Sequence, residues 1–190
     1  MNTVIGFIGK RGCGKDTAAA HLIEKHGFKR LAFADALYQE VSGHYGVPIE
    51  FLQARETKEQ PNLVLDGRPV LSSKSPRQAL QDWGMLRRET DPLYWIKKVT
   101  DKIRSEPGKY IVTDVRFKNE LNAIRDLKGL VIRIRRPAWE ANIGSVGTDQ
   151  HTSETELDGV AADFLLNNRE NALNLLHSEL DEALLSLNAA

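Results

Sequence analysis

The sequence predicts a three-layer α/β fold in which a mostly parallel, five-stranded sheet carries helices on both faces. Short apolar runs rich in β-branched residues alternate with longer stretches whose apolar residues recur at helical spacing. The apolar runs are nearly continuous, which is typical of strands buried on both faces of a parallel sheet. In such a sheet the ligand crevice lies at the carboxyl ends of the strands, so the residues just after each strand are the first candidates for a site.

The amino-terminal part of the chain begins with a predicted strand over residues 3–8, and a helix over residues 15–25 follows a glycine-rich loop. A second strand is predicted over residues 29–33, and a second helix begins over residues 36–41. Over residues 44–76 the periodic patterns weaken, because four prolines and a turn-like Asp-Gly pair interrupt a polar stretch. We predict an insertion or binding loop there, on the substrate side.

The rest of the chain continues the alternation of strands and helices. Three more strands are predicted from runs rich in valine, isoleucine and leucine, over residues 110–113, 130–134 and 162–166. Four more helices are predicted from apolar spacing and terminal signals, over residues 75–88, 93–104, 118–127 and 170–187. Ser75 is suited to cap the first of these helices, because Pro76 then occupies the first turn.

Length and charge limit the classes of function. With 190 residues, 41% of them hydrophobic, the chain is sufficient for one well-packed domain, and we predict a single domain over residues 1–190. The formal net charge is zero, but residues 1–139 carry 25 basic and 16 acidic side chains, whereas residues 140–190 carry 1 and 10. The zero net charge argues against nucleic acid polymers or a membrane as partners, while the basic part is suited to small anionic ligands.

The single cysteine, Cys13, excludes an internal disulfide and a cysteine-based metal site. No stretch approaches the roughly 18 apolar residues of a membrane-spanning helix. The first residues also lack the charged segment of a signal peptide. We therefore expect a soluble protein of the cytoplasm.

The strongest functional signal is a glycine-rich loop between the first strand and the first helix, in the pattern of a phosphate-binding loop (P-loop). It consists of Gly9, Lys10, Arg11, Gly12, Cys13, Gly14, Lys15, Asp16 and Thr17. Glycines allow backbone N–H groups to converge on phosphate oxygens, and Lys15 is placed to contact the β- and γ-phosphates of a nucleotide. A glycine-rich turn that binds no nucleotide is the alternative.

One position of this loop departs from the common pattern. Asp16 follows the lysine where serine or threonine is usual, so Thr17 is the candidate magnesium ligand, directly or through water. Cys13 is interpreted as a small loop residue rather than a nucleophile, because phosphoryl transfer needs no thiol.

A second set of residues narrows the kind of P-loop protein. Arginines recur at predicted strand ends and helix starts, namely Arg77, Arg87, Arg88, Arg116, Arg133, Arg135 and Arg136. Guanidinium groups bind phosphate oxygens through paired hydrogen bonds, so the set indicates a receptor for a second phosphate. For any one of these arginines, a solvated surface position is the alternative. The guanine-reading motif Asn-Lys-x-Asp does not occur in the chain.

Six segments of the chain together resemble a known family. They are Phe33-Ala-Asp35-Ala-Leu37, Pro76-Arg77-Gln78-Ala-Leu80-Gln81-Asp-Trp83-Gly84, Asp91-Pro-Leu-Tyr-Trp95, Val112-Thr113-Asp114-Val115-Arg116-Phe117-Lys-Asn119-Glu120, Ile132-Arg-Ile-Arg135-Arg136-Pro137 and His151-Thr-Ser153-Glu154. In this order they resemble the bacteriophage-type deoxynucleoside monophosphate kinases of the P-loop NMP kinase superfamily. The resemblance implies a P-loop kinase fold with a small lid, ATP and Mg²⁺ as cofactors, and deoxynucleoside monophosphates as substrates. It also permits a homodimer and, for a phage-encoded protein, a location in the host cytoplasm.

Candidate roles at the strand ends combine position with this resemblance. Asp114 ends the third strand, where P-loop enzymes place the acidic residue that orients magnesium, and a strand-end cap is its alternative role. Asp35 follows the second strand and could hold magnesium-bound water or the sugar hydroxyl of the acceptor, or could cap the next helix. The resemblance implies that Arg116 contacts the monophosphate. Asn119 and Glu120 are interpreted as helix-start residues, with recognition of the base as the alternative.

The acceptor side is expected to involve the helix over residues 75–88. Arg77 and Gln81 lie four residues apart and hence on one helical face, where they could bind a phosphate and a base, together with Arg88. Trp83 is interpreted mainly as a core residue, with stacking on the base as the alternative. Arg135, Arg136 and the glycine-containing stretch over residues 142–149 resemble a lid, with residues 136–155 as the lid region, and an ordinary surface loop is the competing interpretation. His151 is given no catalytic role.

We therefore predict ATP-dependent phosphorylation of deoxynucleoside 5′-monophosphates to diphosphates by direct in-line transfer. The predicted catalytic residues are Lys15, Arg116, Arg135 and Arg136. One alternative is another P-loop small-molecule kinase, acting on a coenzyme precursor or on phosphomevalonate. A non-catalytic nucleotide-binding switch is an alternative of another class. Which bases are accepted stays open.

Overall fold

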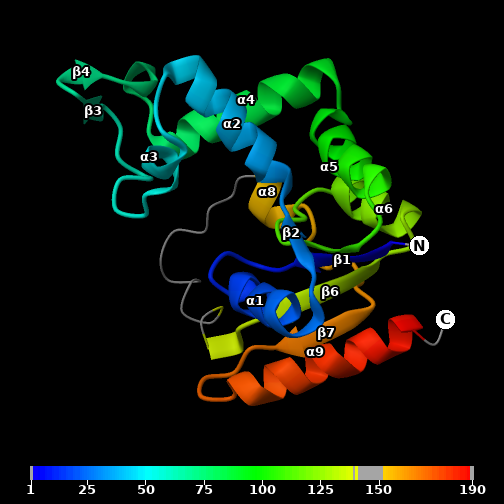
Figure 1. Ribbon diagram of the computed structural model, residues 1–190. Helices are drawn as coiled ribbons and strands as arrows, with labels where there is room; N and C mark the ends of the chain where they lie inside the picture. The colour runs from blue at the N-terminus through cyan, green and yellow to red at the C-terminus, as the bar shows by residue number, and fades with distance from the viewer. Residues whose placement is uncertain (1, 139, 141–151, 189–190) are drawn as a thin grey trace. The chain divides into compact units, whose positions relative to one another are not determined.

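The computed structural model describes residues 2–138, 140 and 152–188 (Figure 1). The chain divides into two compact units. The first, here called the sheet unit, comprises Met1–Ala32 and Thr100–Ala190, and the second, the helical unit, comprises Phe33–Val99. Among the described residues, no helix combines the length and the apolar character that crossing a membrane requires.

The sheet unit contains a five-stranded sheet in the order β2-β5-β1-β6-β7. Its strands are β1 (Thr3–Ile8), β2 (Lys29–Leu31), β5 (Lys109–Val112), β6 (Leu130–Arg135) and β7 (Phe164–Asn167). Every pair of neighbouring strands runs parallel. The mostly parallel five-stranded sheet predicted from the sequence is therefore confirmed. β1 lies at the centre, so the loop that follows it begins between the carboxyl ends of β5 and β6.

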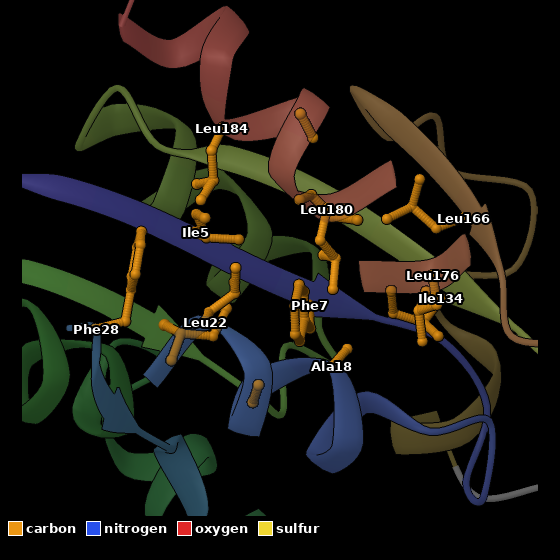
Figure 2. Close-up of a cluster of buried hydrophobic side chains, with 14 of the residues drawn as sticks. Ile5, Phe7, Ala18, Leu22, Phe28, Ile134, Leu166, Leu176, Leu180 and Leu184 are labelled. Carbon is orange, nitrogen blue, oxygen red and sulfur yellow. The ribbon is translucent and has the colours of Figure 1, made fainter. Parts of the chain in front are cut away.

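Helices cover both faces of this sheet. They are α1 (Lys15–His26), α6 (Lys118–Asp126) and α9 (Leu173–Asn188). The short α8 (Thr152–Thr155) also belongs to this unit. Figure 2 shows the core on one face, where Phe7 of β1 packs among Leu22 of α1 and Leu180 of α9. On the other face a Cβ atom at Gly6 would lie only 3.1 Å from Ile124 of α6, so the absent side chain allows this helix close to the sheet.

The helical unit contains α2 (Phe33–Tyr45), α3 (Ile49–Gln53), α4 (Pro76–Thr90) and the first half of α5 (Tyr94–Ser105), which continues into the sheet unit. A second core joins α2, α3 and α4 and includes Val41, Leu52 and Leu80. Ser75 caps α4 as predicted, because its hydroxyl accepts from the Gln78 amide at 3.2 Å and its own amide donates to the Gln78 side chain at 3.0 Å.

The segment predicted as an insertion has more regular structure than its sequence pattern indicates. Besides α3 it forms a two-stranded hairpin, β3 (Val64–Leu65) with β4 (Arg68–Pro69), and a 3₁₀ turn over Leu71–Ser73. Asp66 and Gly67 form the hairpin turn with φ of 51° and 74°, the left-handed conformations that a tight hairpin requires.

The second predicted strand ends earlier than its sequence pattern indicates. β2 stops at Leu31, whose partner Val112 is the last residue of β5, so the ladder has nothing further to pair with. α2 accordingly begins at Phe33 instead of at residue 36.

Candidate active site

The glycine-rich loop after β1 has the close backbone approaches that a P-loop needs. Gly9 has a φ of 141°, and a Cβ atom there would lie 2.2 Å from the carbonyl oxygen of Ile134. Gly12 and Gly14 have φ values of 78° and 100°. A Cβ atom at Gly14 would lie 2.2 Å from the side-chain nitrogen of Asn168. These conformations and contacts explain why glycine occupies the three positions.

Lys15 is the first residue of α1, and its side chain folds back over the loop. Its ammonium nitrogen donates to the carbonyl oxygens of Gly9 at 2.8 Å and Lys10 at 3.0 Å. Asp16 and Thr17 follow in the first turn of the helix and are exposed. The ammonium group and the amino-terminal end of α1 therefore place positive charge at the same location, which favours an anionic ligand.

Cys13 is a buried structural residue of this loop. Burial raises the pKa of its thiol, and the opposing effect of the Lys15 ammonium does not compensate for it. The Cys13 carbonyl accepts a hydrogen bond of 3.0 Å from the side chain of Asn168, which follows β7 and also donates its amide to Arg135. No role was predicted for Asn168, although its place just after the fifth predicted strand was a signal.

The loop after β5 carries Asp114 and Arg116. The Arg116 side chain forms an ion pair with Glu154 of α8. Burial opposes the charge of its guanidinium group, but the carboxylates of Glu154 and Asp114 outweigh burial and raise the pKa of Arg116. The buried carboxylate of Glu120 accepts from the backbone amides of Arg116 at 2.8 Å and Phe117 at 3.1 Å. Glu120 is thus a helix-start residue as predicted, and it fixes the backbone that presents Arg116.

The segment around α8 also contacts the P-loop. The Lys10 ammonium group donates to the Asp158 carboxylate at 2.6 Å and to the Glu154 carbonyl oxygen at 2.7 Å. Glu154 therefore contacts Lys10 through its backbone and Arg116 through its side chain. The resemblance includes the segment from His151 to Glu154, but no role was predicted for Glu154 or Asp158.

Arg133 and Arg135 lie at the carboxyl end of β6 and differ in their contacts. Arg133 donates to the carbonyl oxygens of Leu157 at 2.8 Å and Val160 at 2.7 Å, which makes it a structural residue. Arg135 forms an ion pair with Glu140, whose carboxylate oxygen lies 2.9 Å from the arginine Nε.

A hollow of about 360 Å³ opens beside the P-loop within the sheet unit. Its wall includes Gly9 and Lys10 of the loop together with Arg135 and Glu140. Arg135 therefore lies next to the beginning of the P-loop.

Arg136 forms a longer contact of 3.6 Å with the exposed carboxylate of Glu170. Most of the lid that the sequence predicts over residues 136–155 lies outside the described residues, and so does His151.

The predicted acceptor residues of α4 lie in the helical unit. Arg77 donates from its Nε to Glu59 at 2.6 Å, and only 18% of its side chain is exposed. Gln81 follows one turn later on the same helix and is half-buried. The guanidinium group of Arg88 lies close to Gly84, and a Cβ atom at Gly84 would lie 3.1 Å from it.

Asp35 also belongs to the helical unit. It lies in the first turn of α2, two residues after Phe33, the residue at which the helix begins. The alternative interpretation of Asp35 as a cap for a helix from residue 36 is therefore wrong.

Two further residues of the helical unit, Trp83 and Arg87, converge on Glu40. The Glu40 carboxylate accepts from the Trp83 indole at 3.1 Å, from the Arg87 Nε at 2.9 Å and from the Tyr94 hydroxyl. Burial opposes ionisation of Glu40, but these hydrogen bonds outweigh it and lower its pKa. Trp83 also packs against the core of this unit, in agreement with its interpretation as a core residue.

Comparison with known proteins adds independent findings. The sequence model of a family described as deoxynucleotide monophosphate kinase matches residues 77–180. A protein of Acanthamoeba polyphaga mimivirus, whose inferred activity is that of a deoxynucleotide monophosphate kinase, is 30% identical over 185 residues, with 88% of this chain and 89% of that protein covered.

Solved structures with a similar fold include two kinases. The dephospho-CoA kinase from Campylobacter jejuni matches with a TM-score of 0.53 at 16% identity and covers 98% of both chains. A gluconokinase from Sinorhizobium meliloti 1021 matches with a TM-score of 0.50 at 13% identity over 97% of this chain and 93% of that one. At these identities the likeness shows the fold alone, and it confirms the predicted P-loop kinase fold.

Proposed function

The chain belongs to the deoxynucleotide monophosphate kinase family, and we propose that it transfers the γ-phosphoryl group of ATP to the 5′-phosphate of a deoxynucleoside monophosphate. The observation that carries this proposal is the pair of loops at neighbouring strand ends of the sheet unit. One loop, after β1, holds Lys15 over its own backbone, and the other, after β5, carries Asp114 and Arg116.

The transfer we propose is a direct in-line displacement. An oxygen of the acceptor phosphate forms a bond to the γ-phosphorus while the bond from that phosphorus to the bridging oxygen of ADP breaks. The acceptor oxygen is already anionic, so no side chain is needed to remove a proton. The protein contributes by positioning both nucleotides and by neutralising their charge.

The residues at these two strand ends fit a magnesium ion. Mg²⁺ prefers oxygen ligands, and the chain offers the exposed hydroxyl of Thr17 in α1 and the carboxylate of Asp114 after β5. β1 and β5 are paired strands, with Gly6 opposite Val112, so the segments that follow them start side by side. Thr17 and Asp114 would hold the ion, which when bound would offset the negative charge of the ATP phosphates.

The P-loop from Gly9 to Thr17 would hold the phosphates of ATP. Its backbone N–H groups and the Lys15 ammonium group supply the donors, and Arg135 at the adjoining hollow would approach the transferred group together with Arg136.

For the acceptor we propose Arg116 in the sheet unit and Asp35, Arg77, Gln81 and Arg88 in the helical unit. A guanidinium group can bind two phosphate oxygens at once, and Arg116 is fixed for such a contact by Glu154 and by the bonded backbone of its loop. Gln81 offers an amide one turn from Arg77, which suits the edge of a base.

The experiment that tests this function is a survey of turnover with ATP and Mg²⁺. All deoxynucleoside and ribonucleoside monophosphates are offered, alongside dephosphocoenzyme A and phosphomevalonate, and both ADP and the phosphorylated product are quantified. We expect a diphosphate from at least one deoxynucleoside monophosphate. Product formation only with one of the other acceptors would replace this assignment, and nucleotide binding without any product would favour a switch.

A further inference from the structure

A cluster of histidines and one aspartate joins α1 to α9. His21 and His26 lie on α1, and Asp181 lies on α9. The Nε2 atoms of His21 and His26 lie 2.8 Å and 2.7 Å from the same carboxylate oxygen, Asp181 Oδ1. The side chains are partly buried, with 9%, 26% and 27% exposed. All of these residues belong to the sheet unit, and His26 is the last residue of α1, at the end opposite Lys15.

We propose that His21, His26 and Asp181 form a binding site for a divalent transition-metal ion, with Zn²⁺ as the expected occupant. Two imidazoles and one carboxylate are a donor set that zinc uses in proteins. The three ligand atoms already lie within 4.8 Å of one another. Donors of a tetrahedral zinc ion, each about 2.0–2.1 Å from the metal, lie about 3.3 Å apart, so each of the two Nε2–Oδ1 distances would widen by about 0.5 Å when the ion binds.

The surroundings of Asp181 support coordination through a single oxygen. Lys25 donates to the other carboxylate oxygen, Oδ2, at 2.7 Å, which orients the group and leaves Oδ1 directed at the two imidazoles. The positive charge of Lys25 opposes the ion, but 56% of its side chain is exposed, so water screens that repulsion.

The ring of His21 is also held in place from outside the proposed ligand set. His177 of α9 stacks on it with ring centroids 4.0 Å apart and an interplanar angle of 15°. A hollow of about 240 Å³ bordered by His26 and Asp181 gives the ion a path from solvent.

This site would differ in chemistry and place from the magnesium site at the P-loop. Imidazole nitrogens suit zinc and its neighbours in the transition series, whereas magnesium prefers oxygen ligands. The ion would tie α1 to α9 through residues that lie 160 and 155 positions apart in the sequence. The inference rests on the geometry of α1 and α9 and does not depend on the proposed phosphoryl transfer.

The test uses the full chain without a histidine tag, stripped of metal and titrated with Co²⁺ and with Zn²⁺. We expect one equivalent of Co²⁺ to bind with the intense visible bands of a tetrahedral nitrogen and oxygen environment, and Zn²⁺ to displace it. Zn²⁺ should also raise the unfolding temperature, because an ion that binds only the folded state stabilises it.

Two variants each remove one proposed ligand, and a third variant is the control. His26→Gln and Asp181→Asn should each weaken Co²⁺ binding at least about 100-fold, since each removes a direct ligand. His177→Gln, which leaves the three ligands in place, should retain binding within about tenfold. Thermal unfolding of each variant without metal verifies that it is folded.

Two results would overturn the proposal. One is the absence of a tetrahedral Co²⁺ spectrum in the wild-type protein, which would make the cluster a set of hydrogen bonds and ion pairs only. The other is equal Co²⁺ affinity in folded wild-type and His26→Gln proteins, which would place the ion elsewhere. If Asp181→Asn does not fold, His26→Gln alone decides, because Lys25 keeps its partner in that variant.

Discussion

Arg116, in the loop after β5, forms an ion pair with Glu154 of α8, and the backbone carbonyl of Glu154 accepts a hydrogen bond from Lys10 of the P-loop. One short helix therefore contacts both loops that we assign to the two nucleotides. In the sequence, Arg116 and Glu154 are 38 residues apart. Their ion pair can form only when the sheet unit is folded, so folding of this unit sets the orientation of the Arg116 side chain.

Replacing Arg116 by lysine should weaken binding of the acceptor more than binding of ATP. Arg116→Lys keeps the charge, but an ammonium group cannot contact two phosphate oxygens in the planar geometry of guanidinium. We expect KM for the deoxynucleoside monophosphate to rise about tenfold while KM for ATP changes less than about twofold, as measured by initial rates. Arg104→Lys on α5 is the matched control and should leave both values unchanged. A selective rise in KM for ATP would assign Arg116 to the other nucleotide.

Arg77 provides a second test of the acceptor side. Arg77→Ala should raise KM for the acceptor and spare the affinity for ATP, measured by equilibrium titration with a non-hydrolysable ATP analogue. Glu59→Ala removes the carboxylate that Arg77 contacts and leaves the guanidinium group in place, so it separates loss of the ion pair from loss of the arginine. Loss of ATP affinity alone in Arg77→Ala would reverse the assignment.

Substitution of Gly9 should damage both stability and nucleotide binding. Gly9→Ala places a Cβ atom 2.2 Å from the backbone oxygen of Ile134 at a φ of 141°, so the backbone must move. We expect a loss of about 2–4 kcal/mol in the free energy of unfolding, measured by urea denaturation. Gly43→Ala is the control, because a Cβ atom there has no neighbour within 4 Å and alanine favours the helix. A Gly9→Ala protein as stable as wild type would contradict the geometry of this loop.

Removal of the Asn168 side chain should loosen the P-loop without unfolding the protein. Asn168→Ala loses the 3.0 Å hydrogen bond to the Cys13 carbonyl. We expect affinity for ATP to fall about fivefold, which corresponds to about 1 kcal/mol for one hydrogen bond. Asn174→Ala, at an exposed position of α9, is the control. Equal affinity in the two variants would remove Asn168 from the site.

Glu40 should make the stability of the helical unit depend on pH. Hydrogen bonds from Tyr94, Trp83 and Arg87 outweigh burial and hold its pKa below the ordinary value of 4.5. The stabilisation by the ionised carboxylate is therefore complete above pH 4.5 and is lost as the pH falls through the lowered pKa. In urea denaturation from pH 7 to pH 3, the stability difference between wild type and Glu40→Gln should stay constant above about pH 5 and shrink below pH 4.5. A difference that grows on acidification would contradict this sign.

Much of the fold could be predicted because its signals are local. Five apolar runs identified the five strands, and Ser75 with Pro76 identified the start of α4. The Gly-Lys spacing after β1 located the P-loop for the same reason, since the loop geometry is encoded in consecutive residues. The end of β2 could not be predicted, because it depends on where its partner β5 stops.

The roles of residues that act through contacts distant in the sequence could not be predicted. Glu154 belongs to a segment that carries the resemblance and Asp158 does not, but nothing local in either position predicts the contacts with Arg116 and Lys10 that the fold creates. Glu40 gives no local signal either, since its partners come from α4 and α5. The cluster of His21, His26 and Asp181 likewise forms only when α9 packs beside α1.

The central claim is that Lys15 serves phosphoryl transfer to a deoxynucleoside monophosphate. Its most direct test is the transfer of radioactive label from [γ-³²P]ATP to each deoxynucleoside monophosphate by wild type, by Lys15→Ala and by the exposed control Lys102→Ala. We predict labelled diphosphate from wild type and the control, and a loss of at least about 100-fold in folded Lys15→Ala, because the lysine neutralises the transferred charge. Full activity in Lys15→Ala, or wild-type protein that labels no deoxynucleoside monophosphate, would contradict the account.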